Sequence, residues 1–384
     1  MVALVGVGLL IGPALYAVLL VWLRGGIRQE KAGGQNAELL TDEAALPLFS
    51  VMLAARDEAA TLLHLLEALR AQSLPPQYFE VLIADDHSTD GTAALVAAAA
   101  PNVPFALRLI ALPPGTTGKK AALAAAEAQA RAAWVVCTDA DCCPAPGWLR
   151  AYAELVQVPR PTPLHFISGP VRLTPGGAWF DALLGLEFAG LVGVGAACIG
   201  RGRPTMCNGA NLAFRRRTFH EVGGYADNQG IASGDDEFLL HKMHQRYPGG
   251  IQFLADARAL VDTPAPATWR ALLRQRVRWA SKWPHYRTRA PQQLALLVLG
   301  ANVSLALGLV ASVFWPPLRS WVAAAWALKL GGDIWLLAPM LTLLNRRRWL
   351  AAWLPLQLLY APYALAVGLA GQRGEYRWKG RQVR

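Results

Sequence analysis

The sequence predicts an α/β domain with a mostly parallel sheet, flanked by transmembrane α-helices. Short apolar runs alternate with helical patterns between about residues 45 and 290, and long apolar runs lie on either side of that stretch. The composition agrees, since 54% of the 384 residues are hydrophobic and the mean hydropathy is +0.27. These values are too apolar for an ordinary soluble protein and indicate a membrane protein.

The alternating pattern predicts individual strands and helices. Strands are predicted at 48–54, 79–84, 105–112 and 134–137, and helices at 59–69, 91–99 and 119–132. Strands that alternate with helices in this way form a parallel sheet with helices on both faces. Ligands of such sheets bind beyond the carboxyl ends of the strands.

The long apolar runs predict membrane helices at both ends of the chain. Residues 1–24 are predicted to form one transmembrane helix. Residues 292–371 are predicted to hold three more, in the runs 294–314, 321–344 and 350–369. A signal peptide would carry its basic residues before the apolar run, whereas here they follow it.

Basic residues beside these runs predict which side of the membrane the domain occupies. Arg24, Arg28 and Lys31 follow the first helix, and a basic cluster between Arg274 and Arg289 precedes the second. Because cytoplasmic segments retain positive charge, the 45–290 domain is predicted to be cytoplasmic, on a bacterial-type inner (cytoplasmic) membrane. The net charge of +11 fits this bias and also suits lipid headgroups or a diphosphate. No stretch has the pattern of a nucleic-acid binder, so no nucleic-acid partner is expected.

The number of spans stays open. Four spans would leave the basic tail at 372–384 outside the cell, where positive charge is disfavoured. Lys329 and Asp333 lie one turn apart in the run 321–344, so either they pair inside a span or the run is broken or re-entrant. The apolar segment 179–199 is predicted to be an interfacial helix, because a span there would divide the 45–290 domain between two compartments.

The cysteines indicate a reducing compartment. There are five of them, at Cys137, Cys142, Cys143, Cys198 and Cys207. An odd number without disulfide or zinc-ligand spacing predicts reduced, structural thiols, which fits a cytoplasmic domain.

Acidic residues follow three of the predicted strands. They are Asp57 and Glu58, Asp85 and Asp86, and Asp139 and Asp141, after the first, second and fourth strands. Carboxylates gathered at one sheet edge repel each other unless a cation or a donor-rich ligand lies between them. Asp139 and Asp141 offer oxygen ligands for Mg²⁺ or Mn²⁺, which would stabilise a departing diphosphate; taken alone, they also fit two surface acids in a turn.

Three further motifs each allow a functional and a structural interpretation. Asp85 and Asp86 fit hydrogen-bond acceptors for a nucleoside, although the residues after them favour a helix start. Lys119 fits a contact to the base or the phosphates, or simply an exposed helix terminus. Asp235 and Asp236 fit a general base for an acceptor hydroxyl, or charges favoured by a helix dipole.

The last motif, Gln275-Arg276-Val277-Arg278-Trp279, precedes the second predicted span. Its arginines fit positive charge retained in the cytoplasm. Gln275, Arg278 and Trp279 on one helix also fit a site that binds a diphosphate and forms the floor of an acceptor site.

Together these motifs resemble the membrane-bound members of family 2 of the inverting glycosyltransferases, which have the GT-A fold. The resemblance covers residues 49–282, and its motifs occur in order: Ser50 to Glu58, Asp85-Asp86-x-Ser88-x-Asp90, Gly118-Lys119, Asp139-x-Asp141, Cys207 to Asn211, Gly234-Asp235-Asp236 and Gln275-x-x-Arg278-Trp279. Asp235 stands where this family usually has Glu, and Ala124 where an Asn is common.

The resemblance implies a role for each motif residue. Nucleotide-sugar contacts are expected from Ala55, Glu58, Asp85, Asp86, Lys119, Asp139, Gln275, Arg278 and Trp279. Acceptor-side contacts are expected from Asn208, Gly209, Asn211 and Trp279. Asp139 and Asp141 are expected to bind the metal, and Asp236, with Asp235 as the alternative, to act as the base.

The implied reaction is a single displacement that inverts the anomeric carbon, with the sugar taken from a nucleotide-sugar, expected to be UDP-linked. A membrane lipid is the favoured acceptor, because the spans are few and no further domain is evident. The alternatives are a processive polysaccharide synthase that extends a glycan, an inactive membrane scaffold and a transporter.

Overall fold

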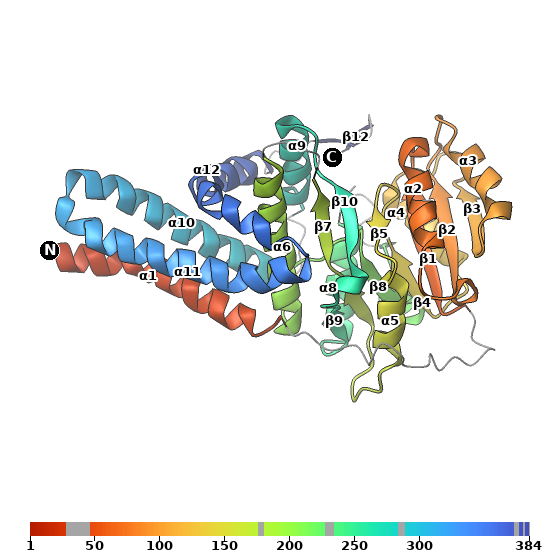
Figure 1. Ribbon diagram of the computed structural model, residues 1–384, viewed down its shortest axis with the longest axis horizontal. Helices are drawn as coiled ribbons and strands as arrows, with labels where there is room; N and C mark the ends of the chain where they lie inside the picture. Colours follow the sequence, from red (N-terminus) through yellow and green to blue (C-terminus); the bar gives the residue numbers. More distant parts are fainter. Residues whose placement is uncertain are drawn as a thin grey trace. The chain divides into compact units, whose positions relative to one another are not determined.

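The computed structural model describes residues 1–27, 47–175, 180–226, 234–282, 289–371, 376–378 and 381–383 (Figure 1). The chain forms two compact units. The α/β unit comprises Arg28–Gly177, Met206–Ala265 and Arg377–Arg384, and the helical unit comprises Met1–Ile27, Ala178–Thr205 and Pro266–Tyr376. Of the predicted features, Arg28, Lys31, the first residue of the 179–199 helix and much of the 372–384 tail lie outside the described residues.

A seven-stranded sheet forms the centre of the α/β unit. Its strands, in spatial order, are β3 (Ala106–Ala111), β2 (Phe79–Asp85), β1 (Phe49–Ala55), β4 (Trp134–Cys137), β8 (Leu212–Arg215), β6 (Phe166–Ser168) and β9 (Ile251–Phe253). Neighbouring strands of this sheet pair in parallel except at β8, which runs antiparallel to β4 and β6. The predicted class, a mostly parallel α/β sheet, is confirmed, and the four predicted strands agree to within a residue at each end.

Helices and a smaller sheet complete this unit. The helices are α2 (Ala59–Arg70), α3 (Thr92–Ala99), α4 (Lys119–Ala128), α5 (Trp148–Gln157), α7 (Arg216–Glu221) and α8 (Asp235–Arg246). The smaller sheet has the order β5 (Cys143–Pro144), β10 (Val261–Pro264) and β7 (Val171–Thr174). One apolar core joins α4 and α8 to the main sheet, with Leu123 and Leu240 against Met52, Val135 and Phe214. This core fixes the starts of α4 and α8 relative to the strand ends.

One predicted boundary is wrong. The alanine-rich run 119–132 predicts one helix, but α4 ends at Ala128. Beyond it, the Arg131 N–H donates to Glu80 Oε1 at 2.8 Å and the Ala132 N–H donates to Ser50 Oγ at 3.1 Å. These backbone groups bond to β1 and β2 instead of extending the helix, so tertiary hydrogen bonds override the helix propensity of alanine.

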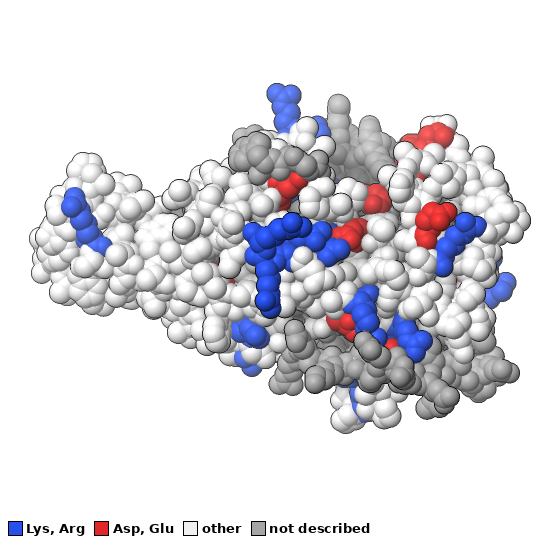
Figure 2. All heavy atoms as spheres, viewed as in Figure 1, with Lys and Arg blue, Asp and Glu red and all other residues white. Residues whose placement is uncertain are grey.

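The helical unit contains the predicted membrane segments. Its helices are α1 (Val2–Arg24), α6 (Asp181–Gly200), α9 (Trp269–Ala280), α10 (Ala290–Phe314), α11 (Arg319–Leu343) and α12 (Trp353–Gly371). After α12, two short strands, β11 (Tyr376–Trp378) and β12 (Arg381–Val383), end the described chain. Among the described residues, four helices are long and apolar enough to cross a membrane: α1, α6, α10 and the segment Pro316–Leu343. On the face shown in Figure 2, the surface over α1, α10 and α11 is almost free of charged side chains, as a lipid-facing surface requires.

Two segments differ from the simplest four-span arrangement. The helix α6, predicted to be interfacial, is itself long enough to span a membrane. Of the 18 most apolar consecutive positions in this helix, 67% are buried within the protein, whereas the corresponding share is 22% in α1 and in α10. The last apolar segment is bent by 56° between Arg347–Tyr360 and Pro362–Ala370, which fits a broken span or a re-entrant loop. Pro362 explains the bend, because proline removes a helical hydrogen bond.

Small residues bring α1 close to its neighbours. A Cβ atom at Gly6 would lie 2.4 Å from the Trp321 ring of α11, so only glycine fits there. Close approach through small residues is how membrane helices gain packing contacts where lipid offers no hydrophobic driving force.

Lys329 and Asp333 form a buried pair inside α11, which is continuous across both residues. The Lys329 ammonium donates to Asp333 Oδ2 at 2.7 Å and also to the Gln357 side chain of α12. The Tyr16 hydroxyl of α1 donates to Asp333 Oδ1 at 2.6 Å. Of the two alternatives left open by the sequence, pairing within the helix is the one found, and the pair links three helices.

Removing one member of this pair is expected to destabilise the protein strongly. Asp333→Asn keeps the shape of the side chain but leaves the buried Lys329 charge uncompensated, which costs about 3–5 kcal/mol in the free energy of unfolding. The double variant Lys329→Met/Asp333→Asn removes both charges and should recover at least half of that loss. Denaturant unfolding in detergent micelles measures both, and equal losses for the single and double variants would contradict the pairing.

Candidate active site

The carboxyl ends of β1, β2 and β4 meet at one edge of the main sheet, because the three strands are adjacent and parallel. Asp85 is the last residue of β2 and pairs in register with Ala55, the last residue of β1. Asp139 and Asp141 follow β4 in the turn that leads to β5. The sequence predicted this acidic edge, and the structure places the residues there.

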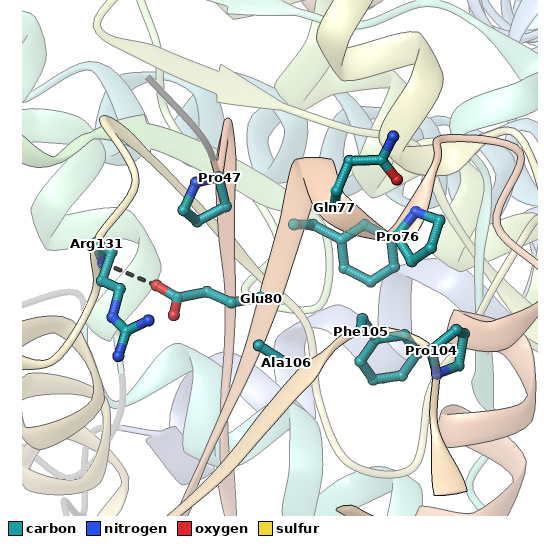
Figure 3. Close-up of a pocket in the computed structure, with 9 residues that line it drawn as sticks. Pro47, Pro76, Gln77, Glu80, Pro104, Phe105, Ala106 and Arg131 are labelled. Atoms are coloured by element: carbon teal, nitrogen blue, oxygen red, sulfur yellow. Dashed lines mark hydrogen bonds between the residues drawn. The ribbon is translucent and has the colours of Figure 1, made fainter. Parts of the chain in front are cut away.

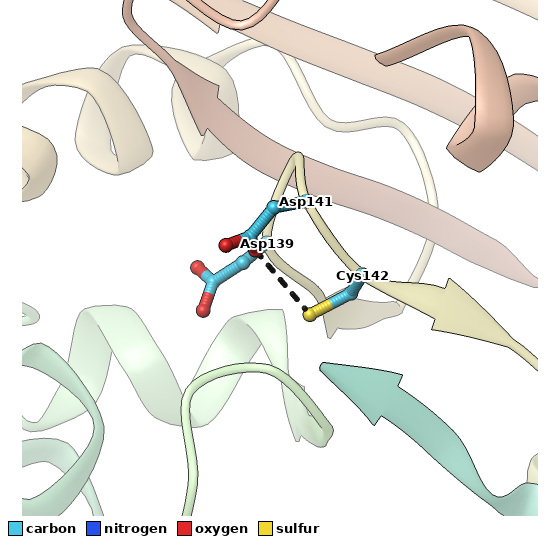
Figure 4. Close-up of side chains that lie close together, drawn as sticks. All are labelled: Asp139, Asp141 and Cys142. Carbon is cyan, nitrogen blue, oxygen red and sulfur yellow. Dashed lines mark hydrogen bonds between the residues drawn. The ribbon is translucent and has the colours of Figure 1, made fainter. Parts of the chain in front are cut away.

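Asp139 and Asp141 project their carboxylates to the same side of this turn (Figure 4). One oxygen of each carboxylate and the Cys142 sulfur all lie within 4.8 Å of one another. Partial burial of the Asp141 carboxyl group, together with the charges of Asp139 and Glu58, raises the pKa of Asp141. Burial and the neighbouring negative charges destabilise the charged form of this carboxyl group, and a bound cation would stabilise it. The three potential ligand atoms of Asp139, Asp141 and Cys142 therefore fit a divalent metal ion.

Cys142 is a neighbour of this acidic pair that the sequence analysis treated as structural. Its thiol is buried and donates to Asp141 Oδ1 at 3.7 Å. Burial raises the pKa of this thiol well above its usual range, as do the charges of Asp139 and Asp141. The thiol therefore stays protonated in this state, as expected for a reduced structural cysteine.

Lys119, the first residue of α4, connects the two acidic groups of the site. Its ammonium donates to Asp139 Oδ1 at 2.7 Å and lies 3.6 Å from Asp235 Oδ2. Burial disfavours the ammonium charge, but the carboxylates of Asp139, Asp235 and Asp236 outweigh it and raise the pKa of this lysine. A single cation thus bridges the turn after β4 and the start of α8.

Asp236 is held at the start of α8 by two backbone donors. Its Oδ2 accepts from the Gly209 N–H at 2.9 Å and its Oδ1 from the Glu237 N–H at 2.8 Å. A Cβ atom at Gly209 would lie 3.5 Å from Lys119 Nζ and 3.6 Å from the Oδ2 atoms of Asp235 and Asp236. The Gly209 backbone therefore lies directly beside the charged cluster, at ordinary van der Waals distance from it.

Asp85 and Asp86 form the side of the site nearest β2. Asp86 Oδ2 accepts from the Gly118 N–H at 3.0 Å and lies 3.7 Å from Arg56 Nη1. Asp85 Oδ2 accepts from the Ser88 N–H at 3.2 Å, whereas its Oδ1 is buried and has no hydrogen-bond partner among the described residues. A buried carboxylate oxygen without a donor fits a ligand that brings one, such as a nucleoside base or ribose.

The loops after β1 and β2 are bonded to each other. Asp57 Oδ1 accepts from the Thr89 N–H at 2.8 Å, and the Ala55 carbonyl accepts from the Asp86 N–H at 2.9 Å. Glu58 Oε2 accepts from the Thr61 hydroxyl at 2.9 Å. These hydrogen bonds of Ala55 and Glu58, both predicted to contact the nucleotide-sugar, are thus internal to the loops that shape this side of the site.

The loop at 207–211 contributes to the site through its backbone. Asn208 Oδ1 accepts from the Ala210 N–H at 3.0 Å, which holds the turn that presents Gly209 to Asp236. Asn211 is fully buried, so its side chain does not face an acceptor. Its Oδ1 accepts from Trp148 Nε1 at 2.8 Å and from the Tyr152 hydroxyl at 2.9 Å.

Asn211 therefore acts as a hydrogen-bonding centre beneath the site. Its amide also donates to the carbonyls of Pro170 and Ala259, each at 2.8 Å. Asn211→Ala is expected to lower the free energy of unfolding by about 2–4 kcal/mol, because it leaves several buried groups without partners. Asn208→Ala loses one half-buried bond, so its loss should stay near 1 kcal/mol. Thermal unfolding compares the two, and equal losses would contradict this role for Asn211.

The other predicted site residues belong to the helical unit. Gln275, Arg278 and Trp279 are partly buried on α9, and the contacts described above do not include them. Between them, Arg276 is buried and pairs with Glu187 of α6. This pair could not be predicted from the sequence, because a contact between residues 89 positions apart leaves no local signal.

A cavity of about 260 Å³ lies at the opposite ends of the strands (Figure 3). It is lined by Pro47, Pro76, Gln77, Phe79, Glu80, Pro104, Phe105, Ala106 and Arg131. Its one carboxylate, on Glu80, accepts from Ser50 at 2.7 Å, from the Arg131 N–H at 2.8 Å and from Arg108 at 2.9 Å. These bonds satisfy Glu80 within the protein, so this carboxylate is structural.

A mostly parallel sheet with an acidic edge at its carboxyl ends is the arrangement expected of a GT-A glycosyltransferase, and comparisons with known proteins agree. The model of glycosyl transferase family group 2 matches residues 134–366, and the model of glycosyl transferase family 2 matches residues 50–163. The chain belongs to the family 2 glycosyltransferases. The comparison with curated proteins found no match.

The comparison with solved structures also found glycosyltransferases. The mannosyltransferase PcManGT from Pyrobaculum calidifontis, in complex with GDP-Man and Mn²⁺, is 19% identical, with a TM-score of 0.54 over 97% of both chains. TarS 1–349 from S. aureus is 15% identical, with a TM-score of 0.44 over 88% of this chain and 96% of that chain. Glucosyl-3-phosphoglycerate synthase from Mycobacterium tuberculosis is 19% identical, with a TM-score of 0.42 over 62% of this chain and 78% of that chain. At this identity the likeness to PcManGT concerns the fold.

Proposed function

We propose that this glycosyltransferase transfers a sugar from a nucleotide-sugar to a membrane lipid at the cytoplasmic face, with inversion at the anomeric carbon. The observation that carries the proposal is the Lys119 ammonium, 2.7 Å from Asp139 and 3.6 Å from Asp235. This contact links the turn of Asp139 to the start of α8, where Asp236, the proposed base, follows Asp235. A displacement needs both, because the leaving diphosphate and the attacking hydroxyl lie on opposite sides of the same carbon.

Each residue of this site has a separate role in a single displacement reaction. Asp236 accepts the proton of the acceptor hydroxyl, whose oxygen forms a bond to the anomeric carbon as the bond to the diphosphate oxygen breaks. The nucleoside diphosphate leaves with the electron pair of that bond, and the configuration inverts. The Gly209 N–H keeps the Asp236 carboxylate in a fixed orientation. Asp235, paired with Lys119, is the alternative base.

Donor binding is assigned to the opposite side of the cluster. Asp139 and Asp141 would hold Mg²⁺ or Mn²⁺, and the ion would supply positive charge to the leaving diphosphate. PcManGT, which shares the fold, was solved with GDP-Man and Mn²⁺. Asp85 and Asp86 would bind the nucleoside, and Gln275 and Arg278 the diphosphate. The side chain of Trp279 would contact both the donor and the acceptor.

The helical unit supports a lipid acceptor. Its described part includes four helices that are long and apolar enough to span a membrane, which would keep the site at the bilayer surface. The basic residues around these helices favour the cytoplasmic face of a bacterial-type inner membrane. The alternative, a polysaccharide synthase, would use the same chemistry repeatedly on a growing chain.

The experiment is product analysis with the purified full chain in detergent. UDP- and GDP-linked sugars are incubated with membrane lipid extract, with and without Mn²⁺, and the products are identified by mass spectrometry. A lipid that carries one sugar supports the proposal, and a long glycan supports the polysaccharide synthase. The absence of transfer from every donor would contradict the proposed donor class and favour an inactive scaffold. The anomeric configuration of the product tests inversion.

A further inference from the structure

A buried ion pair joins α6 to α9 within the helical unit. Arg276 Nε donates to Glu187 Oε1 at 3.1 Å, and Arg276 Nη2 donates to Glu187 Oε2 at 2.5 Å. The two side chains are only 5% and 8% exposed. The Tyr363 hydroxyl of α12 donates to the same Glu187 oxygen as Arg276 Nε, at 3.4 Å. A two-point contact of this kind fixes the plane of the guanidinium group as well as its position.

Arg276 in turn contacts two residues of the predicted substrate-binding motif. Its guanidinium carbon lies 4.3 Å from the centre of the Trp279 ring, which is cation–π distance. Its Nη1 donates to Gln275 Oε1 at 2.7 Å. The Trp279 ring also lies 6.3 Å, centre to centre, from Phe188, the residue after Glu187. The α6 segment is therefore linked to Trp279 directly through Phe188 and indirectly through Glu187 and Arg276.

The location of Glu187 is unusual for a carboxylate. The helix α6 is long and apolar enough to span a membrane, and most of it is buried within the protein. A buried charge is costly unless it is paired and hydrogen-bonded, and here the pairing is complete on both oxygens. An apolar residue would fill this position without that cost, so the pair requires an explanation other than packing.

We propose that Glu187 is a positioning residue for the acceptor site: through Arg276 it orients Trp279 and Gln275 on α9. The inference rests on the proposed function, since it assumes that Trp279 contacts the acceptor. Glu187 itself touches no substrate. Without the Glu187 carboxylate, the Arg276 guanidinium is free to rotate. The Trp279 ring then loses the guanidinium contact that holds it in place.

The first test compares Glu187→Gln with the control Glu127→Gln. Glu127 is also buried and paired with an arginine, Arg216 at 2.9 Å, but it lies in the α/β unit. Hydrogen exchange of the purified proteins, followed by mass spectrometry of peptides from 269–280, requires no substrate. Glu187→Gln should speed exchange in these peptides and Glu127→Gln should not. Unchanged exchange in Glu187→Gln would overturn the proposal.

The second test is a double-mutant cycle with Trp279→Phe, using lipid extract in detergent micelles as the acceptor. Glu187→Gln should raise the acceptor KM about tenfold, with the donor KM changed less than about threefold. In the Trp279→Phe background the same change should have little further effect. Additive losses, or equal changes in both KM values, would show a general structural role and overturn the inference. Wild-type activity of Asp236→Asn would instead refute the proposed base and leave this cycle intact.

Discussion

Asp236→Asn is expected to lower the rate of sugar transfer by about 10²–10⁴-fold while nucleotide-sugar binding stays close to wild type. The substitution keeps the shape of the side chain and its contact with the Gly209 N–H, but it removes the acceptor for the hydroxyl proton. Single-turnover transfer and equilibrium binding of the nucleotide-sugar measure the two quantities separately. A rate equal to that of the wild type would show that Asp236 is not the base.

Asp235→Asn is the matched comparison, since it alters the neighbouring acid. Asp235 is buried, and its Oδ2 lies 3.6 Å from Lys119. Its loss should weaken the charge balance of the cluster and lower the rate by about tenfold, less than the loss of the base. The reverse order of the two effects would identify Asp235 as the base.

The double variant Asp139→Asn/Asp141→Asn is expected to lose Mn²⁺ binding and to lower turnover by about 10³-fold or more. Together these residues provide the carboxylate oxygens of the acidic turn, and a metal ion contributes several kcal/mol to stabilising a leaving phosphate, at about 1.4 kcal/mol per tenfold in rate. Electron paramagnetic resonance of free Mn²⁺ measures binding, and turnover against Mn²⁺ concentration measures the rate.

Asp256→Asn provides the control for this double variant. Asp256 is an acid of the same unit, but it pairs with Arg258 and caps a short helix outside the cluster. This variant should bind Mn²⁺ normally. If chelator-treated wild-type enzyme keeps full turnover, a metal-independent reaction replaces the one proposed here.

The strands and the acidic edge could be predicted because their signals are local. The apolar run before Asp139 marks β4, and the carboxyl ends of adjacent parallel strands must share an edge. The end of α4 could not be predicted, because the groups that stop it, Glu80 and Ser50, lie 51 and 82 positions away. Local propensity alone favours a helix throughout that run.

The side-chain contacts within the site also could not be predicted from the sequence. The motifs predicted that Lys119 approaches a donor, but its contacts with Asp139 and Asp235 arise only when β4 and α8 come together. The acceptor-side prediction for Asn211 followed from a motif, whereas the structure places this side chain in the interior with four hydrogen bonds. The sequence alone does not distinguish a polar loop residue that faces solvent from one that is buried.

The most direct measurement is an experimental structure of the full chain with Mn²⁺ and a non-hydrolysable nucleotide-sugar. The proposed function predicts one ion at about 2.1 Å from a carboxylate oxygen of Asp139 or Asp141, bound to the diphosphate, with the anomeric carbon between that diphosphate and Asp236. A nucleotide-sugar bound elsewhere, for example in the cavity beside Glu80, with Asp236 remote from the sugar, would contradict it.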